Sequence, residues 1–279
     1  MIEGYKYYLA DTPHPGRTVP VDHDPASFAE TMHYDTEMIL RSEADLQAHF
    51  GERWQRELNR TYTALLDPDR LVVGIGSGYG EHEFLLHRCG YRVIASDIVP
   101  GLGKAFSRLD PSFRFIRIDA FRDDYAERMK QNQIDVDAFD ILITGLLFYF
   151  DDAKAHDLLV RIHDNLGLNS HLVLTLRYRD GLIPRFADAM AGFETKIMAA
   201  VRRRGIVRKH HGYRRSAKDI EILTNKAGFR TVSKTQAMFG YEMTRSFLLG
   251  QPHLVKAACK IDQRLPLFHS AVVFDLIKG

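Results

Sequence analysis

A chain of 279 residues is long enough for one large domain, or for one domain with a cap over it. Its hydrophobic share of 45% and its charged share of 27% are ordinary for a globular protein in water. The formal net charge of +2 excludes a nucleic-acid or membrane binder that relies on overall charge, so any basic surface must be local.

The cysteines and the first residues of the chain indicate a cellular compartment. Cys89 and Cys259 are too few and too far apart for a disulfide framework or a zinc knuckle. The longest apolar runs fall short of the ~20 residues that span a bilayer. Residues 1–16 lack the basic segment and following apolar stretch of a secretory signal. We therefore expect a cytoplasmic protein with no membrane span.

The first 66 residues are expected to form an arm and helices that cap the rest of the chain. Residues 1–22 are rich in Tyr, Pro and His and are predicted to be irregular. Between residues 24 and 66, apolar positions recur every three or four residues, which predicts two or three helices. Ser42 is expected to cap one of these helices, because an acid follows three residues later.

From residue 67 onward, short apolar runs alternate with helical patterns. We predict strands at 70–76, 91–98, 113–120, 139–150 and 170–178. Helices are predicted between them at 81–90, 103–109, 125–134 and 151–167. Because the strands are nearly all apolar, this alternation favours a parallel sheet that is covered by helices on both faces.

The alternation is interrupted twice before the chain ends. After a first interruption at about 179–216, we predict a helix at 217–228 and a sixth strand at 229–238. A second, helical interruption at about 241–268 precedes a seventh strand at 270–279. We expect a domain over 67–279 with these two segments as cap insertions above the carboxyl ends of the strands, where ligands bind in such folds.

The stretch "LVVGIGSGYGEHEFLL" (71–86) carries the main functional signal. A nicotinamide or flavin fingerprint would need G-x-G-x-x-G, but Tyr79 or Glu81 stands at the sixth position, and no Gly-Lys-Ser/Thr indicates a P-loop. The observed pattern is G-x-G-x-G, with the glycines at 76, 78 and 80. Alternate glycines between a strand and a helix allow the backbone to approach a ligand closely.

In this pattern the sequence resembles the class I S-adenosylmethionine-dependent methyltransferases, from about Leu71 to Gly279. The resemblance covers the whole strand–helix order and includes the late "AGFRTV" unit. It implies a Rossmann-like fold, S-adenosylmethionine as cofactor, and a glycine turn that contacts the methionine part. An acid at the end of the second strand, here Asp97 in "VIASDI", would bind the ribose hydroxyls, for which a carboxylate offers two acceptor oxygens.

The resemblance also implies the remaining cofactor contacts. Ile98 would lie against the adenine, Asp119 in "IRIDAF" would accept from its amino group, and Ala120 would offer backbone contacts. Thr144, in the fourth-strand element "TGLLFYF", would flank the transferable methyl group. The implied cofactor-binding residues are therefore Gly76, Ser77, Gly78, Gly80, Asp97, Ile98, Asp119, Ala120 and Thr144. The alternative for each of the two acids, taken alone, is the cap of a helix.

The chain departs from the family at Gly74. The family usually has Asp or Glu at this position, two residues before the first glycine of the motif, where the acid cradles the methionine ammonium group. Here another acid, such as Glu81 or Asp35, would have to take that place, or the cofactor would bind with low affinity.

The acceptor is indicated partly by what the sequence lacks. The fourth strand carries no (Asp/Asn)-Pro-Pro-Tyr element for adenine or amide nitrogen, and no Pro-Cys pair supports cytosine chemistry. Asp151 and Asp152 are expected to cap the following helix, so no metal site is predicted. A Tyr at the end of the fourth strand, Tyr149, and two Arg after the fifth, Arg177 and Arg179, fall where the family builds acceptor pockets.

A basic segment at 201–215 holds seven Arg or Lys and two His. It is either a solvated helix end or a basic lip, with Arg204 among its residues, that binds a phosphate, carboxylate or sulfated acceptor. His210, in the same segment, is a candidate general base, and Tyr149 is the second catalytic candidate.

The sequence therefore predicts a methyltransferase that acts on an oxygen or nitrogen of a small or medium, anionic metabolite, glycan or natural-product intermediate. The alternatives are a non-catalytic scaffold or subunit with the same fold, and an RNA or protein methyltransferase. Nucleic acid is not an expected partner, whereas a homodimer is compatible with the sequence.

Overall fold

The computed structural model describes residues 7–9, 35–50, 53–134, 138–177, 206–208, 213, 215–239 and 269–279. Most of the two predicted cap insertions lies outside these residues. Within the described part of the chain, every helix is too short or too polar to cross a membrane.

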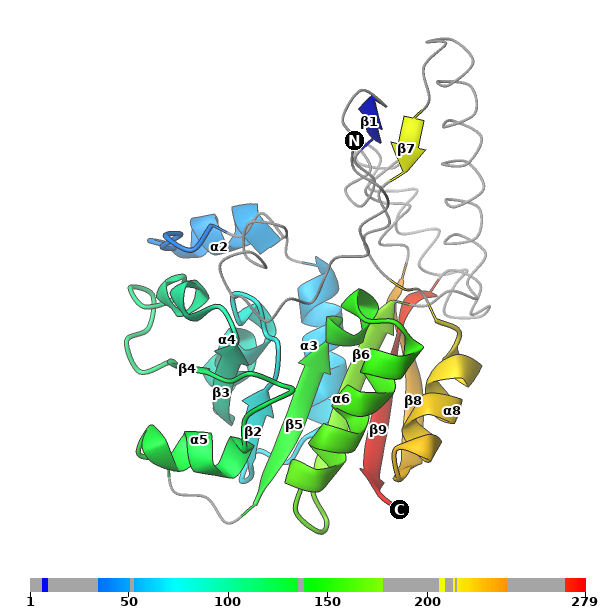
Figure 1. The fold of residues 1–279 in the computed structure, drawn as a ribbon. Helices are drawn as coiled ribbons and strands as arrows, with labels where there is room; N and C mark the ends of the chain where they lie inside the picture. The colour runs from blue at the N-terminus through cyan, green and yellow to red at the C-terminus, as the bar shows by residue number, and fades with distance from the viewer. Residues whose placement is uncertain are drawn as a thin grey trace.

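A seven-stranded sheet forms the centre of the molecule (Figure 1). Its order is β4-β3-β2-β5-β6-β9-β8, and β9 alone runs antiparallel to its neighbours. This confirms the prediction of a mostly parallel sheet with seven strands. The strands are β2 (Leu71–Gly74), β3 (Arg92–Asp97), β4 (Arg114–Arg117), β5 (Phe139–Thr144), β6 (His171–Arg177), β8 (Phe229–Phe239) and β9 (His269–Lys278).

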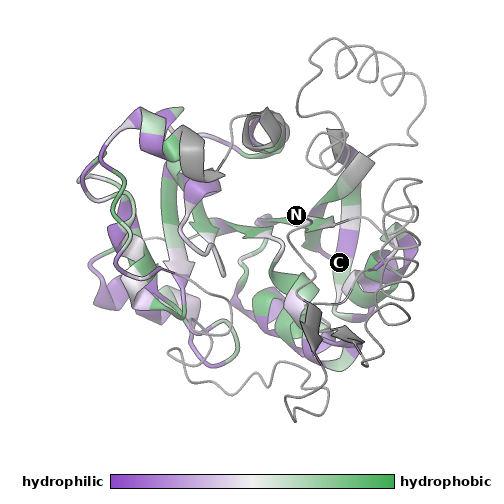
Figure 2. Cartoon of the chain, turned by 90° about the horizontal axis from the view of Figure 1, so that it is seen from above, coloured by the Kyte–Doolittle hydropathy of each residue, from purple (hydrophilic) through white to green (hydrophobic). Residues whose placement is uncertain are grey.

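Helices cover both faces of the sheet. Apolar side chains of α5 (Tyr125–Gln131), α6 (Asp152–Asn165) and α8 (Ala217–Lys226) share one core with the sheet. On the opposite face, α3 (Arg53–Leu65) and α4 (Glu81–Arg88) share a second core with it. Successive side chains of a strand point to opposite faces, which is why both faces need a cover and why the central strands β2, β5 and β6 are mostly apolar. Figure 2 shows this hydrophobic colour gathered along the central strands.

The N-terminal residues contribute a layer of this fold. Leu58 and Tyr62 of α3 are buried against Val72 of β2. A shorter helix, α2 (Glu43–Phe50), places Leu46 in a small cluster with Phe84 of α4. A further pair of strands, β1 (Tyr7–Leu9) and β7 (Ile206–Arg208), joins the start of the chain to the basic segment in antiparallel register.

Side-chain caps begin several helices, as their sequences predict. Ser42 Oγ accepts from the N–H of Asp45 at the start of α2, and Asp151 caps α6 by accepting from the N–H of Lys154. The predicted capping role of both residues is confirmed. Such caps satisfy backbone N–H groups that have no partner inside the helix.

Three predictions differ from the structure. Residues 1–22 are not irregular throughout, because Tyr7–Leu9 form the strand β1. The segment 103–109 is not an α-helix: a 3-10 helix covers Pro100–Lys104 and turns follow, in keeping with two glycines that disfavour helical backbone. The strand predicted over 139–150 ends at Thr144. Gly145 adopts a positive φ of 80°, which extended backbone does not allow, and a second 3-10 helix, η2 (Leu146–Tyr149), follows.

Candidate functional site

The candidate site lies at the carboxyl ends of the parallel strands. The chain leaves β2 toward β3 and β4 on one side, and β5, the other neighbour of β2, leads away to β6. The crossover direction reverses between β2 and β5, which is the place where ligands bind in open α/β sheets. Four loops that carry predicted site residues start at this edge: those after β2, β3, β4 and β5.

The glycine turn after β2 has a backbone that only glycine adopts readily. The φ angles are 64° at Gly76, 59° at Gly78 and 83° at Gly80, all in the left-handed region. The turn is fixed to β3, because the N–H of Ser77 donates to the carbonyl of Ser96 at 2.8 Å. The alternate spacing of the glycines is therefore a requirement of the turn itself.

The turn also packs closely on the loop after β5. A Cβ at Gly76 would lie 2.7 Å from the side chain of Leu146, the first residue of η2. The two loops on either side of the crossover point therefore touch, which brings the predicted glycine turn and the predicted methyl-flanking element together.

Asp97 joins the glycine turn to the end of β3. Its side chain is buried, and its two oxygens accept from the N–H of Gly78 and from the N–H of Val99, each at 3.0 Å. Burial raises the pKa of Asp97 to about 6, so the carboxylate is mostly ionised at neutral pH. Each oxygen keeps a second lone pair for a further donor. Val99 is the residue that caps the following 3-10 helix, so the helix-cap alternative for Asp97 does not hold.

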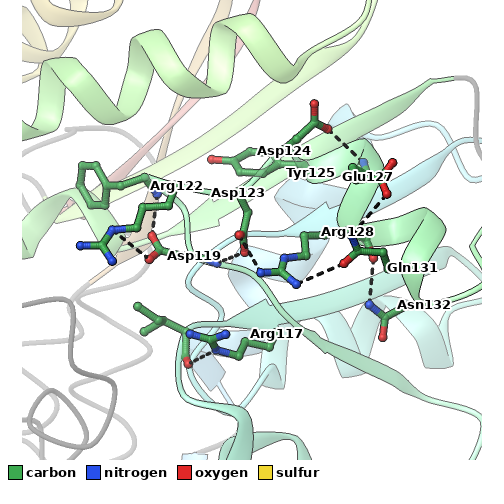
Figure 3. Close-up of polar contacts among 12 residues, drawn as sticks. Arg117, Asp119, Arg122, Asp123, Asp124, Tyr125, Glu127, Arg128, Gln131 and Asn132 are labelled. Atoms are coloured by element: carbon green, nitrogen blue, oxygen red, sulfur yellow. Dashed lines mark hydrogen bonds and ion pairs between the residues drawn. The ribbon is translucent and has the colours of Figure 1, made fainter.

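Asp119 lies in the loop after β4 (Figure 3), and Ala120 follows it in the chain. Asp119 Oδ1 accepts from the N–H of Phe121 at 3.0 Å, and Oδ2 lies 3.9 Å from the Arg122 guanidinium. The carbonyl of Ala120 accepts from the Tyr125 hydroxyl at 2.7 Å. Asp124 is the N-cap of α5, so Asp119 is a loop residue and not the cap of that helix.

Thr144, at the end of β5, belongs to a hydroxyl network that the sequence does not reveal. The hydroxyl of Tyr62 forms hydrogen bonds with Thr144 Oγ1 at 2.9 Å and with Thr175 Oγ1 of β6 at 2.8 Å. Tyr62 is fully buried. The helix α3 therefore fixes the ends of both strands that follow the crossover point.

The loop after β5 holds Tyr149 and is clamped by a buried arginine. Arg215 donates to the carbonyls of Leu147 and Phe150 at 2.8 and 2.7 Å, and to the Asp152 carboxylate at 2.8 Å. Tyr149, half-buried, packs on the core beside this clamp. Arg215 is 5% exposed, so the last residue of the basic segment has a structural role.

The structure describes only one of the other residues that were predicted to bind the methyl acceptor or to take its proton. Arg177 ends β6 at the same edge of the sheet. Arg179, Arg204 and His210 lie outside the described residues.

The acid next to Gly74 is Glu83, and not Glu81 or Asp35 as predicted. Glu83, in the first turn of α4, is 2% exposed, and its Oε1 accepts from Ser77 Oγ at 2.9 Å. A Cβ at Gly74 would overlap this same oxygen. The carboxylate of Asp35 instead accepts from the N–H of Glu37, and the N–H of Asp35 donates to the Tyr79 hydroxyl. No sequence pattern pointed to Glu83, because its place depends on how the turn folds back onto β2.

The charges around this carboxyl are of one sign. Burial raises the pKa of Glu83 to about 8 and that of Glu81 to about 7, and the negative charges of Glu81 and Asp97 add to the rise at Glu83. Burial also lowers the pKa of His82 to about 4, so that this neighbour is neutral at pH 7. In the part of the chain that the structure describes, no Lys, Arg or His nitrogen lies within 4 Å of the Glu83 carboxylate.

Comparisons with known proteins agree with this architecture. No protein-family model and no curated protein matches the sequence. Among solved structures, a magnesium protoporphyrin IX methyltransferase from Synechocystis with bound S-adenosylhomocysteine is 13% identical and has a TM-score of 0.53, over 81% of this chain and 83% of that one. A mitomycin 7-O-methyltransferase is 16% identical with a TM-score of 0.53, over 90% of this chain. The chain spans 60% of the length of that enzyme.

A third solved structure, an S-adenosylmethionine-dependent methyltransferase from Archaeoglobus fulgidus, is 16% identical with a TM-score of 0.50, over 84% of this chain and 98% of that one. At these sequence identities the similarity shows the fold alone. The chain therefore has the Rossmann-like fold found in S-adenosylmethionine-dependent methyltransferases.

Proposed function

We propose that the protein is an S-adenosylmethionine-dependent methyltransferase. The observation that carries the proposal is the hydrogen bond between the glycine turn and Asp97, in which the N–H of Gly78 donates to the buried carboxylate. It lies at the crossover edge of a sheet whose fold is that of known methyltransferases. Asp119, in the loop after β4, and Thr144, the last residue of β5, lie at the same edge.

The residues at this edge fit the parts of the cofactor. The glycine turn, with Ser77, offers closely approachable backbone to the methionine part. Asp97 has lone pairs left for the two ribose hydroxyls after its contacts with Gly78 and Val99. Ile98, Asp119 and Ala120 follow on the loops after β3 and β4, where the adenine would lie.

The bound cofactor supplies a methyl group activated by a positively charged sulfur. The task of the chain is to align an acceptor with that methyl group and to exclude water. Thr144 and Tyr149 would border the place for the acceptor: Tyr62 holds Thr144, and Arg215 holds the loop that carries Tyr149. We assign Arg177, Arg179 and Arg204 to an anionic acceptor, and His210 to removal of its proton.

A thermal-shift measurement on the full chain tests the proposal. S-adenosylhomocysteine at 100 times its Kd should stabilise the folded state by about 2.7 kcal/mol and raise the Tm. NAD at the same concentration is the matched control and should leave the Tm unchanged, because the turn lacks the dinucleotide spacing. A chain that responds to neither S-adenosylmethionine nor S-adenosylhomocysteine would instead be a scaffold with the same fold.

A further inference from the structure

We infer that Glu83 supplies the carboxylate that receives the ammonium group of the methionine moiety, in the place that Gly74 leaves open. The inference rests on the proposed function. It concerns a carboxylate that comes from the first turn of a helix rather than from the end of the first strand of the domain.

The geometry makes position 74 and Glu83 mutually dependent. Gly74 is the last residue of β2, and any side chain there would overlap Glu83 Oε1 and approach its Cδ to 2.7 Å. The space left by the missing side chain is therefore filled by the Glu83 carboxyl together with the hydroxyl of Ser77. An acid at position 74 and the observed position of Glu83 exclude each other.

The carboxyl is held in place by the glycine turn. Ser77 Oγ donates to Glu83 Oε1 at 2.9 Å, while the backbone N–H of Ser77 is bound to the carbonyl of Ser96. Ser96 Oγ in turn donates to the carbonyl of Gly74. The acid is thus oriented by the same turn that is proposed to contact the methionine part.

The electrostatic setting favours a cation from outside the protein. Glu81 on the same helix and Asp97 on β3 are the charged groups that act on Glu83, and both are acids. No cationic side chain of the described residues lies within 4 Å of it. A buried carboxylate without a cation is unfavourable, so a ligand ammonium group that pairs with it gains a charge-assisted hydrogen bond.

The affinities for three ligands distinguish a failure of this inference from a failure of the proposed function. Calorimetric titration uses S-adenosylhomocysteine, its analogue without the α-amino group, and 5′-methylthioadenosine, which lacks the whole amino-acid part. The wild-type chain should bind the analogue without the amino group about 10- to 100-fold more weakly than S-adenosylhomocysteine. Equal affinities would overturn the inference. Failure to bind any of the three would overturn the proposed function itself.

Variants provide the second measurement. Glu83→Gln should lower the affinity for S-adenosylhomocysteine about 10-fold or more and leave the affinity for 5′-methylthioadenosine unchanged. The control Glu81→Gln should change both affinities only slightly. An equal loss of affinity for both ligands in a folded Glu83→Gln protein would contradict the inference.

The double variant Gly74→Asp/Glu83→Ala returns an acid to the strand and removes Glu83, one of the two side chains that it would overlap. The other, the Ser77 hydroxyl, loses its hydrogen bond to Glu83 in this variant and can rotate away. It should recover most of the affinity lost in Glu83→Ala, whereas an additive loss would contradict the inference. This comparison remains informative if Glu83→Gln does not fold.

Discussion

Gly74 and Glu83 illustrate how much a single position depends on its neighbours. Asp97 and Asp119 were named as site candidates because the resemblance to the methyltransferase family implies an acid at the end of the second strand and another after the third. Glu83 was not predictable, because its carboxyl reaches Gly74 only through the fold of the turn between them. An acid in the first turn of a helix is common, and by itself it indicates only a favourable interaction with the helix dipole.

The pH dependence of stability tests the protonation of Glu83. Burial raises its pKa from 4.5 to about 8, so between these values the folded chain binds more protons than the unfolded chain. The free energy of unfolding of the ligand-free protein should therefore fall as the pH rises from 4.5 toward 8, by at most about 1.4 kcal/mol per pH unit for one group.

Urea unfolding at a series of pH values measures this effect. Glu83→Gln cannot ionise, so its unfolding free energy should fall less steeply than that of the wild type across this range. Glu81 and Asp97 also have raised pKa values and add to the slope, whereas the lowered pKa of His82 opposes it between about pH 4 and 6.5. Parallel curves for the two proteins would show that Glu83 titrates normally.

At the level of helices and strands, the sequence patterns were reliable where burial decides the structure. Parallel strands buried on both faces produce apolar runs, and all seven runs correspond to strands. The patterns failed at 103–109 and after Thr144, where glycine backbone and contacts between loops decide the conformation. Arg215 shows the same limit, because its partners lie 63 to 68 residues earlier in the chain.

The hydrogen bonds from Arg215 to the η2 segment predict how a substitution at Arg215 changes stability. Arg215→Ala removes the donors to two buried carbonyls and should lower the free energy of unfolding by about 2–4 kcal/mol. Arg230→Ala, at an exposed position of β8, is the control and should change stability by less than about 0.5 kcal/mol. Urea unfolding measures both, and hydrogen exchange at residues 146–149 should rise in the first variant alone. Equal exchange in both variants would show that η2 holds its conformation without Arg215.

For the molecule as a whole, contacts between distant segments complete the site. The hydroxyl of Tyr62 lies on an N-terminal helix and reaches strand ends 82 and 113 residues away. Such contacts leave no local pattern. The sequence therefore predicted a mostly parallel sheet of seven strands with ligands at the carboxyl ends of its strands, but neither the order of the strands in the sheet nor the residues that hold this edge together. The same architecture occurs in methyltransferases with only 13% to 16% identity, which shows how weakly the fold constrains individual residues.

Calorimetric titration of S-adenosylhomocysteine into wild type, Asp97→Ala and Asp69→Ala tests the central claim most directly. Asp69, an exposed residue before the start of β2, is the control for a lost carboxylate. We predict saturable binding to the wild type, unchanged affinity in Asp69→Ala, and a loss of about 1–3 kcal/mol in Asp97→Ala, which is about 5- to 150-fold in Kd. The absence of binding to the wild type, or equal affinity in wild type and Asp97→Ala, would contradict the account.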